Sequence, residues 1–496
     1  MSGMQTTIRF LFVGLCLVLA ACVSPLQRDL NPPEMQGVRW GLLVTDMDGN
    51  ELAAINPDQR FLPASNTKLF TTAAAFRWQA DLAAMQPRLA THVTLEPATG
   101  DAPPSLVLHG RGDPHLSDSP DCETRCLATL ADAVAATGLA AITHVIGDDT
   151  WFPDERWGPG WSWEDLQSDF GTATSALSIN ANAVTLTVTP GATIGAPADV
   201  AWADADAAYM IINQTITAPL EPAGGDAADD PEDDFAIVHL PGTATVRVSG
   251  HVPPDAGPRT YRLGLDDPAL AAATRFSALL QARGMRVEGE ALARHRSSTA
   301  TPPPDAALTS LAPETLPLAA LPPLSLADAL TEISKDSQNL YAEILLRHLG
   351  RISEDGTAKA GLARVEVLLA EAGAAPNGYD FFDGSGLSVY NRVSPRTIVA
   401  LLRHAATQDW GAAWRETLPI GGVDGSLRHR FRGTLLEGKI VAKTGTLKGT
   451  NALSGYMTAA SGQTLVFSII ANDRPLAVPS AVLVMDAALV RIAERN

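Results

Sequence analysis

The fold of this chain is decided by residues 63–76, which read PASNTKLFTTAAAF. Ser65 and Lys68 lie three positions apart, and residues i and i+3 of a helix share one face, so the lysine amine can reach the serine hydroxyl. A serine hydroxyl becomes a nucleophile when a base takes its proton, and a lysine can be that base if burial or a neighbouring cation lowers its pKa. The residues after Lys68 are mostly apolar, which predicts a buried helix opened by Pro63. The stretch therefore predicts a serine nucleophile with a lysine base.

The segments on either side of this helix form one unit, although they lie far apart in the chain. Before it, residues 38–44 and 51–55 predict two strands joined by a turn. The elements expected after residue 320 are helices at 326–333, 339–349, 397–406 and 480–493 and strands at 438–444, 452–458 and 464–471.

The middle of the chain, from about residue 96 to 320, has a different sequence pattern, with short β-like stretches interrupted by Pro, Gly and Asp. We therefore expect an α/β (α+β) fold in which residues 37–95 and 320–496 form one catalytic domain. Residues 96–319 are expected to be an inserted β-rich region that forms two subdomains.

The length and charge of the chain exclude several classes of protein. At 496 residues it exceeds the roughly 250–300 residues at which one hydrophobic core stops growing. Lys and Arg number 36 against 55 Asp and Glu, which leaves a net charge of −19. No basic cluster interrupts this charge, so the footprint of a nucleic-acid binder is missing. The ten histidines contain no His-Glu-x-x-His pair, and we expect neither a metal nor a cofactor.

The N-terminus has the features of an export signal. The run Phe10–Ala21 is apolar, but its twelve residues are too few to span a bilayer. It fits the apolar part of a secretory signal, and we expect residues 1–21 to be a signal peptide.

The signal ends in LAAC, residues 19–22, which resembles the lipobox of bacterial lipoproteins. We expect Cys22 to be lipidated and residues 22–36, which are polar, to be a lipid-anchored tether. Val23 stands where an inner-membrane retention signal usually has Asp, so we expect an outer-membrane anchor with the body on the periplasmic side. The alternative is an ordinary signal peptide, with Cys22 incidental.

Two further cysteines, Cys122 and Cys126, are four positions apart in a chain that we expect to be exported. An oxidising compartment makes a local disulfide the expected state of such a pair.

Two Ser-x-Asn motifs compete as partners of the serine and lysine. Residues 178–180 precede alternating β sequence in the insert, and Ser178 is interpreted as a turn or strand-start residue. Residues 337–339 lie at a break between two helical runs, where a rigid support can present Ser337 and Asn339 at the edge of a cleft. We therefore favour the second motif.

A third motif, Lys443-Thr444-Gly445-Thr446, ends an alternating strand. Gly445 permits close approach of the backbone to a ligand. Lys443 is expected to place a cation beside Lys68, which would lower the pKa of Lys68, and to attract a substrate carboxylate.

The order Ser-x-x-Lys, Ser-x-Asn, Lys-Thr-Gly resembles the signature of penicillin-binding proteins and serine β-lactamases. A closer resemblance is to the D-alanyl-D-alanine carboxypeptidase/endopeptidase family, the low-molecular-mass class C penicillin-binding proteins. It rests on the long insert and on residues 63–68, 112–114, 383–388, 418–419, 424–425 and 443–446. It implies a penicillin-binding-protein/serine β-lactamase-like transpeptidase domain with a large β-rich insertion.

The resemblance also implies a two-step acyl transfer on peptidoglycan stem peptides, with β-lactam antibiotics as covalent inhibitors. Ser65 would attack the carbonyl of the penultimate D-Ala, Lys68 would take its proton, and Ser337 would relay a proton to the leaving amine. The backbone N–H groups of Ser65 and Thr446 would hold the oxyanion. The residues implied in substrate binding are Asn339, Lys443, Thr444, Gly445 and Thr446. Residues 383–388 are interpreted as a structural turn near the cleft.

Two other functions are compatible with parts of this pattern. A serine β-lactamase or esterase shares the first and third motifs, but it normally has Tyr-x-Asn as the second. A catalytically silent lipoprotein that binds peptidoglycan would have inherited the fold alone. The sequence leaves open whether a D,D-peptidase of this kind cuts the terminal D-Ala or the cross-link between stem peptides.

Overall fold

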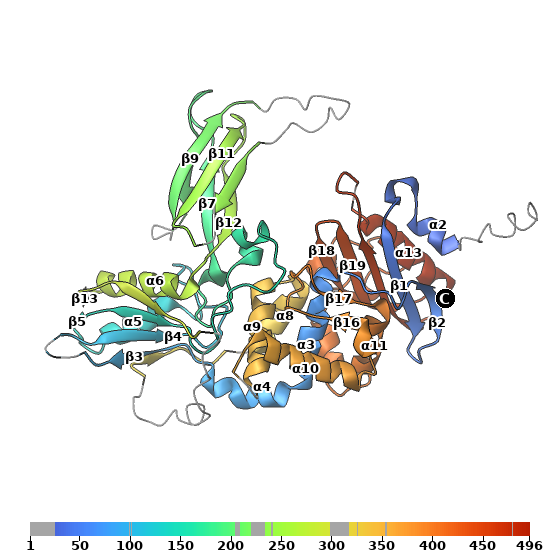
Figure 1. Cartoon of the computed structure of the whole chain (residues 1–496), viewed down its shortest axis with the longest axis horizontal. Coiled ribbons are helices and arrows are strands. Elements are labelled where there is room, and N and C mark those ends of the chain that lie inside the picture. Colours follow the sequence, from blue (N-terminus) through green and yellow to red (C-terminus); the bar gives the residue numbers. More distant parts are fainter. Residues whose placement is uncertain are drawn as a thin grey trace, which may run out of the picture.

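The computed structural model describes residues 25–98, 100, 102–203, 209–219, 234–239, 242–297, 317–324, 326–352, 355–478 and 480–496. The expected signal peptide and Cys22 lie outside these residues. Figure 1 shows three groups of elements: a body of sheet and helices that holds both ends of the chain, a second group around strands β3 to β6, and a lobe of strands that projects away from both.

A five-stranded antiparallel sheet in the order β18-β19-β20-β1-β2 is built from both ends of the chain. Its strands are β1 (Arg39–Asp46), β2 (Glu51–Ile55), β18 (Ile440–Leu447), β19 (Thr450–Thr458) and β20 (Thr464–Asn472). Side chains alternate between the faces of a strand. Accordingly, Leu42 and Val44 pack in one hydrophobic core and Leu43 packs in another.

Helices cover both faces of this sheet (Figure 1). The helices of this body are α2 (Pro25–Leu30), α3 (Lys68–Arg77), α4 (Gln79–Met85), α8 (Leu326–Lys335), α9 (Asn339–Arg351), α10 (Ala358–Glu371), α11 (Pro395–Ala406), α12 (Gly411–Glu416) and α13 (Val482–Arg495). Helix α13 packs on one face, and α11 packs on the other, next to the layer formed by α3, α9 and α10. The expected α/β (α+β) class is thus observed, with α2, α4, α10 and α12 as helices of this body that the sequence analysis did not include.

The expected tether over residues 22–36 is folded in its described part, which corrects that prediction. Helix α2 packs against α13, and Asp29 forms an ion pair with Arg491. Leu30 and Met35 are buried in the same core as the sheet, with exposed fractions of 0% and 2%. These two apolar side chains anchor a segment whose overall composition is polar.

The inserted region contains a mixed five-stranded sheet in the order β14-β6-β4-β3-β15. Its elements are β3 (His92–Glu96), β4 (Ser105–His109), β5 (Ala141–Ile142), β6 (Val145–Asp148), β13 (Arg286–Val287), β14 (Ala291–Arg294), β15 (Ala319–Ala320), α5 (Leu127–Ala135) and α6 (Pro268–Ala282). Because β3 and β15 belong to this sheet, the inserted fold extends from residue 92 to 320, slightly beyond the expected 96–319. Helix α6 packs on β6 and β14, so the region is less purely β than expected.

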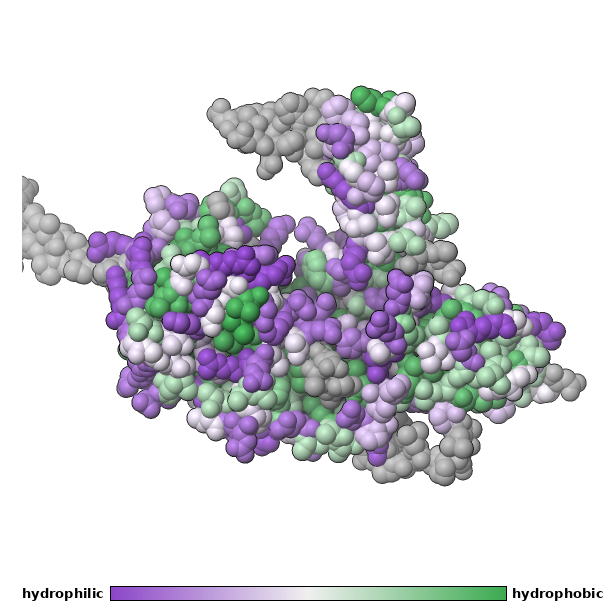
Figure 2. Space-filling view, turned by 180° about the vertical axis from the view of Figure 1, so that it is seen from behind, coloured by the Kyte–Doolittle hydropathy of each residue, from purple (hydrophilic) through white to green (hydrophobic). Residues whose placement is uncertain are grey.

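The projecting lobe consists of two three-stranded sheets, β12-β7-β8 and β10-β11-β9. Its strands are β7 (Ala183–Thr189), β8 (Asp199–Trp202), β9 (Met210–Thr217), β10 (Ala236–His239), β11 (Thr245–Val252) and β12 (Arg259–Gly264). On the face shown in Figure 2, this lobe stands clear of the rest, and apolar residues lie in separate groups among hydrophilic ones. In the described part of the chain, no helix is both long and apolar enough to cross a bilayer.

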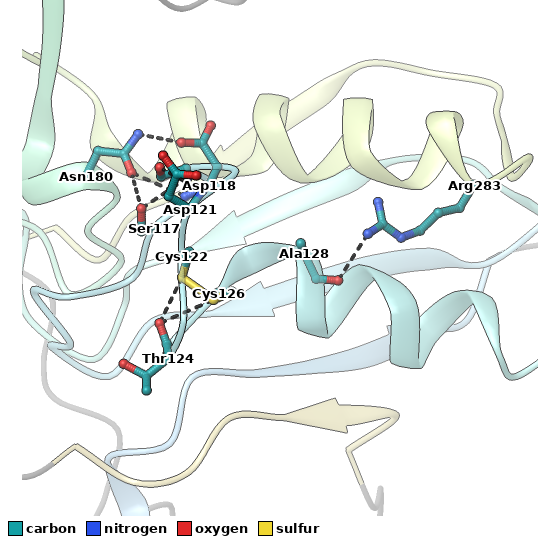
Figure 3. Close-up of a disulfide and its surroundings, with 10 residues drawn as sticks. Ser117, Asp118, Asp121, Cys122, Thr124, Cys126, Ala128, Asn180 and Arg283 are labelled. Atoms are coloured by element: carbon teal, nitrogen blue, oxygen red, sulfur yellow. Dashed lines mark hydrogen bonds between the residues drawn. A yellow bond between two sulfur atoms is a disulfide. The ribbon is translucent and has the colours of Figure 1, made fainter.

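A disulfide joins Cys122 to Cys126, whose Cα atoms are 5.7 Å apart. It closes a short loop directly before α5, and the carbonyl oxygen of Thr124 lies inside that loop (Figure 3). The loop is part of the inserted region and is separate from the three motifs.

Candidate active site

Ser65 lies in a short 3-10 turn, η2 (Ala64–Thr67), that leads directly into α3. The turn is tied to β18 because the Asn66 side-chain amide donates to the carbonyl of Lys443 over 3.1 Å. Gly445 makes this approach possible, since a Cβ at that position would lie 2.5 Å from the carbonyl oxygen of Pro63. The first and third motifs therefore meet at one junction.

Lys68 is fully buried and its amine lies beside the Ser65 hydroxyl, at 3.0 Å between Nζ and Oγ. Two other oxygens lie nearer to Nζ, at 2.6 Å each: Oδ1 of Asn339 and the carbonyl of Ser385. Both can only accept hydrogen bonds. In its ammonium form Lys68 donates to all three oxygens. Once the amine is neutral, it has two N–H groups for Asn339 and Ser385 and one lone pair, which would accept the proton of Ser65.

Asn339 is held in the orientation that this arrangement requires. Its Nδ2 donates to the carbonyl of Phe170 over 2.8 Å. Because a carbonyl cannot donate, the amide must turn its Oδ1 toward Lys68. Phe170 belongs to the inserted region, so the insert takes part in building the site.

Burial lowers the pKa of Lys68 to about 7, against the carboxylates of Asp383 and Glu343, which raise it. This corrects the expectation that Lys443 is the cause. The charge of Lys68 instead affects Lys443. Burial, and then the charge of Lys68, hold the pKa of Lys443 well below its usual range. The physical reason is that a buried ammonium is poorly solvated, which lowers the pKa of both lysines, and the charge of Lys68 adds to this effect at Lys443.

Ser337 lies between α8 and α9, at the break where the sequence analysis placed it. Its backbone has a φ of +62°, which the tight change of direction between the helices imposes. The Lys443 amine donates to the Ser337 hydroxyl over 2.9 Å and to the carbonyl of Thr444 over 3.2 Å. The second and third motifs are thereby joined as well.

The remaining residues of the third motif line the same edge. Thr444 Oγ1 lies 2.8 Å from the hydroxyl of Ser426, which the sequence analysis did not select. Thr446 is exposed at the end of β18. The competing Ser178 is buried elsewhere, where its hydroxyl donates to the carbonyl of Ser175 and accepts from Asn182.

Two buried carboxylates lie near Lys68: Glu343, which sequence reasoning missed, and Asp383, which lies in the turn that was interpreted as structural. Glu343 is four positions after Asn339 on α9, pairs with Arg347 at 3.0 Å, and accepts the backbone N–H groups of residues 384 and 385. A lone acid in the apolar run of α9 was the signal that could have revealed it. Burial raises the pKa of Asp383 to about 6. The 383–388 turn, interpreted as structural, also contacts Lys68 directly, through the carbonyl of Ser385.

The described residues contain no cluster of three or more His, Cys, Asp or Glu that could hold a metal ion. The site holds a serine hydroxyl, a buried lysine beside it whose pKa of about 7 lets it lose its proton near neutral pH, and a second buried lysine that donates to the Ser337 hydroxyl. These are the functional groups of a serine acyl-transfer enzyme of the penicillin-binding class.

Comparison with known proteins agrees with this class. The model of the D-Ala-D-Ala carboxypeptidase 3 (S13) family matches residues 23–495. A D-alanyl-D-alanine carboxypeptidase of Actinomadura sp. (strain R39) is 34% identical over 495 residues, which cover 94% of this chain and 83% of that protein. The D-alanyl-D-alanine carboxypeptidase DacB of Haemophilus influenzae is 24% identical over 94% of this chain and 92% of that protein.

The fold is also that of a solved structure. Penicillin-binding protein 4 (dacB) from Haemophilus influenzae superposes with a TM-score of 0.75 at 23% identity, covering 94% of this chain and 97% of that chain. The chain belongs to the D-Ala-D-Ala carboxypeptidase 3 (S13) family. It is a serine-type D,D-peptidase, and therefore a hydrolase.

Proposed function

We propose that this protein hydrolyses D-Ala-D-Ala bonds of peptidoglycan stem peptides through an acyl-enzyme on Ser65. The observation that carries the proposal is the placement of the Lys68 amine, which lies 3.0 Å from the Ser65 hydroxyl and is held there by Oδ1 of Asn339 and the carbonyl of Ser385. With a pKa of about 7, this amine is available as a base near neutral pH.

The reaction follows from the contacts in the site. Ser65 Oγ bonds to the carbonyl carbon of the penultimate D-Ala as its proton passes to Lys68. Backbone N–H groups of Ser65 and Thr446 hold the oxyanion, and one such donor is worth about 2.7–4 kcal/mol. Collapse of the tetrahedral intermediate breaks the C–N bond, and the amine of the terminal D-Ala leaves with a proton relayed through Ser337. Water then hydrolyses the ester and regenerates the serine.

Lys443 and Thr444 bind the terminal carboxylate of the substrate in this scheme. Lys443 reaches the cleft edge through Ser337, and the Thr444 hydroxyl lies beside that of Ser426. A β-lactam carries a similar carbonyl and carboxylate, so it acylates the same serine.

Covalent labelling with fluorescent penicillin tests this assignment. We expect one adduct, located on Ser65 by peptide mapping, and no labelling or peptidase activity in Ser65→Ala or Lys68→Ala. Loss of the general base alone reduces acylation by ~10²–10⁴-fold. Ser178→Ala is the matched control, because this buried serine lies in the insert, and it should be labelled normally. An adduct on another serine, or an active Ser65→Ala protein, contradicts the proposal.

The products distinguish the possible activities. Purified muropeptide monomers should lose a terminal D-Ala if the protein is a carboxypeptidase, and cross-linked dimers should yield monomers if it is an endopeptidase. Slow release of the penicilloyl group is expected, and rapid release would indicate a β-lactamase instead.

We also propose that the protein is held at the periplasmic side of the outer membrane by a lipid on Cys22. Support comes from the LAAC sequence at residues 19–22. Because the described part of the chain starts at Pro25 in α2, only two residues, Val23 and Ser24, would separate Cys22 from this helix, a span of at most about 10 Å. Cys22→Ser should move the protein from the membrane fraction to the soluble fraction, and a soluble native protein would contradict the anchor.

A further inference from the structure

One segment of the inserted region, residues 158–170, lies against the catalytic residues, and we call it the wall segment. The Ser388 hydroxyl donates to the carbonyl of Pro159 over 2.6 Å, and the N–H of Val389 donates to that of Gly160 over 3.0 Å. Further along, the carbonyl of Phe170 accepts from Asn339. The wall segment therefore touches Asn339, which holds the Lys68 amine, and the end of the 383–388 turn, whose Ser385 carbonyl also holds it.

Within the wall segment, Trp161 makes the most specific contact. Its indole N–H donates to Oδ2 of Asp383 over 3.0 Å. Gly158 makes room for this ring, since a Cβ there would lie 2.6 Å from the indole nitrogen. The placement of the ring is thus built into the local backbone.

Asp383 is buried, with 1% of its surface exposed, and all its acceptor positions are occupied. Its Oδ2 accepts from Trp161 and from the N–H of Ser388, at 3.0 and 2.6 Å. Its Oδ1 accepts from the N–H of Gly386 and from the Asn391 side chain, at 3.0 and 2.6 Å. A carboxylate has about four acceptor sites. Removal of the indole donor therefore leaves one site empty in a place that water does not readily reach.

We propose that Trp161 is a positioning residue for the base Lys68, acting through Asp383. The indole keeps the carboxylate charged and holds the 383–388 turn in place, and that turn presents the Ser385 carbonyl to the Lys68 amine. By this contact the inserted region sets the protonation and orientation of a base that belongs to the catalytic body. The inference rests on the proposed role of Lys68 in acylation.

The charged groups that face Lys68 decide the direction of the expected effect. They are Asp383 on the turn, Glu343 with its partner Arg347 on α9, and Lys443 on β18 with Asp336 nearby. Without the indole donor, Asp383 binds a proton more readily. A protonated Asp383 no longer stabilises the Lys68 ammonium by its negative charge. The pKa of Lys68 therefore falls, and the amine loses its proton at lower pH.

Trp161→Phe tests the inference, because it keeps an aromatic ring and removes only the N–H. The measurement is the second-order rate of acylation by a chromogenic penicillin from pH 5 to 9. We expect a plateau about tenfold lower, from loss of a hydrogen bond to a charged group, and an acidic midpoint shifted to lower pH. Trp163→Phe, an exposed tryptophan of the same segment, is the matched control and should behave like the native protein.

The direction of the midpoint shift distinguishes a positioning role of Trp161 from a general disruption of the site. A site opened to water would shift the midpoint upward, toward the ordinary pKa of lysine, and this would overturn the inference. An unchanged midpoint, with or without a lower plateau, would overturn it as well.

A double variant identifies the route of the effect. If Trp161 acts through Asp383, then Asp383→Asn should also shift the midpoint downward, and Trp161→Phe should change nothing further in that background. Equal effects of Trp161→Phe in both backgrounds would contradict the route. The native protein reports on the proposed function separately: absence of a Ser65 adduct there would overturn the function itself, whereas a normal adduct with an unshifted midpoint in Trp161→Phe would overturn only the role of Trp161.

Discussion

At the scale of single residues, the main feature of the site is that two lysine amines are buried close together. Burial disfavours the charged form of each amine. Lys68 and Lys443 are both at most 1% exposed, and Asp383 and Glu343 lie behind them. With its pKa lowered to about 7, Lys68 can lose its proton near neutral pH, while the Lys443 amine donates to the Ser337 hydroxyl. Function here depends on which of the two amines carries a proton.

The rate of acylation should depend on pH in a way that reports on Lys68. Below its pKa of about 7 the amine is protonated and cannot accept the Ser65 proton, so the rate should fall about tenfold per pH unit at pH 5 to 6. Stopped-flow acylation by a chromogenic β-lactam measures this profile. A rate that is flat from pH 5 to 9 would show that another group is the base.

Replacement of Lys68 by Met should make the protein inactive and change how its stability depends on pH. The pKa of Lys68 is about 7 when folded and near 10.5 when unfolded, so the unfolded chain binds the proton more tightly. The native protein is therefore destabilised at and below pH 7, and this penalty disappears as the pH rises to 10.5. We expect the stability of Lys68→Met relative to the native protein to decline from pH 7 to 10, as measured by urea unfolding. A difference that does not vary over this range would contradict the lowered pKa.

Between elements, the critical contact is that of the turn η2 with strand β18. Gly445→Ala would bring a Cβ to within 2.5 Å of the Pro63 carbonyl, a backbone atom of the turn that carries Ser65. The turn and strand must separate, and a displacement of about 1 Å can cost 10²-fold in rate. We therefore expect a ~100-fold loss of acylation. Gly257→Ala, where no other heavy atom lies within 4 Å, is the matched control and should retain the native rate.

The disulfide before α5 should matter for stability alone. Closing so small a loop is worth about 2 kcal/mol on the chain-entropy estimate. The double variant Cys122→Ser/Cys126→Ser should therefore unfold at lower denaturant concentration by that amount, with an unchanged rate of acylation. A loss of acylation would indicate that the loop is coupled to the wall segment.

Much of the catalytic body was predictable from local pattern, because its elements carry strong signals. The hairpin of β1 and β2, the helix after Ser65 and the break at Ser337 all follow from periodicity and turn residues. The meeting of Ser65 with Lys443, 378 positions away, was inferred from resemblance and not from any local feature. Long-range pairing of this kind depends on tertiary packing, which one sequence does not encode locally.

Other parts of the site carried no local signal. Trp161 and Phe170 lie in the inserted region, and their roles come from single backbone and indole groups. The direction of the charge effect between Lys68 and Lys443 depends on how deeply each is buried, which spacing does not reveal. Similarly, α2 was taken for a tether because its few apolar residues have meaning only once α13 is beside it.

For the molecule as a whole, the inserted region is both an appendage and a component of the catalytic centre. Its projecting lobe stands away from the body, whereas the wall segment at its base touches Asn339 and the 383–388 turn (Figure 1). Changes in the base of the insert are therefore expected to reach the chemistry more readily than changes in the lobe.

The pairing of β1 with β20 has a consequence for biosynthesis. Arg39 lies opposite Asn472, so the sheet cannot be completed until nearly the whole polypeptide has left the ribosome. At ~5–20 residues per second, the serine at position 65 exists for roughly 20–80 seconds before the strand bearing Lys443 is made. During that interval strands β18, β19 and β20 do not yet exist, so the sheet that brings the third motif to the turn of Ser65 cannot form. The catalytic centre can therefore be assembled only after synthesis is almost finished.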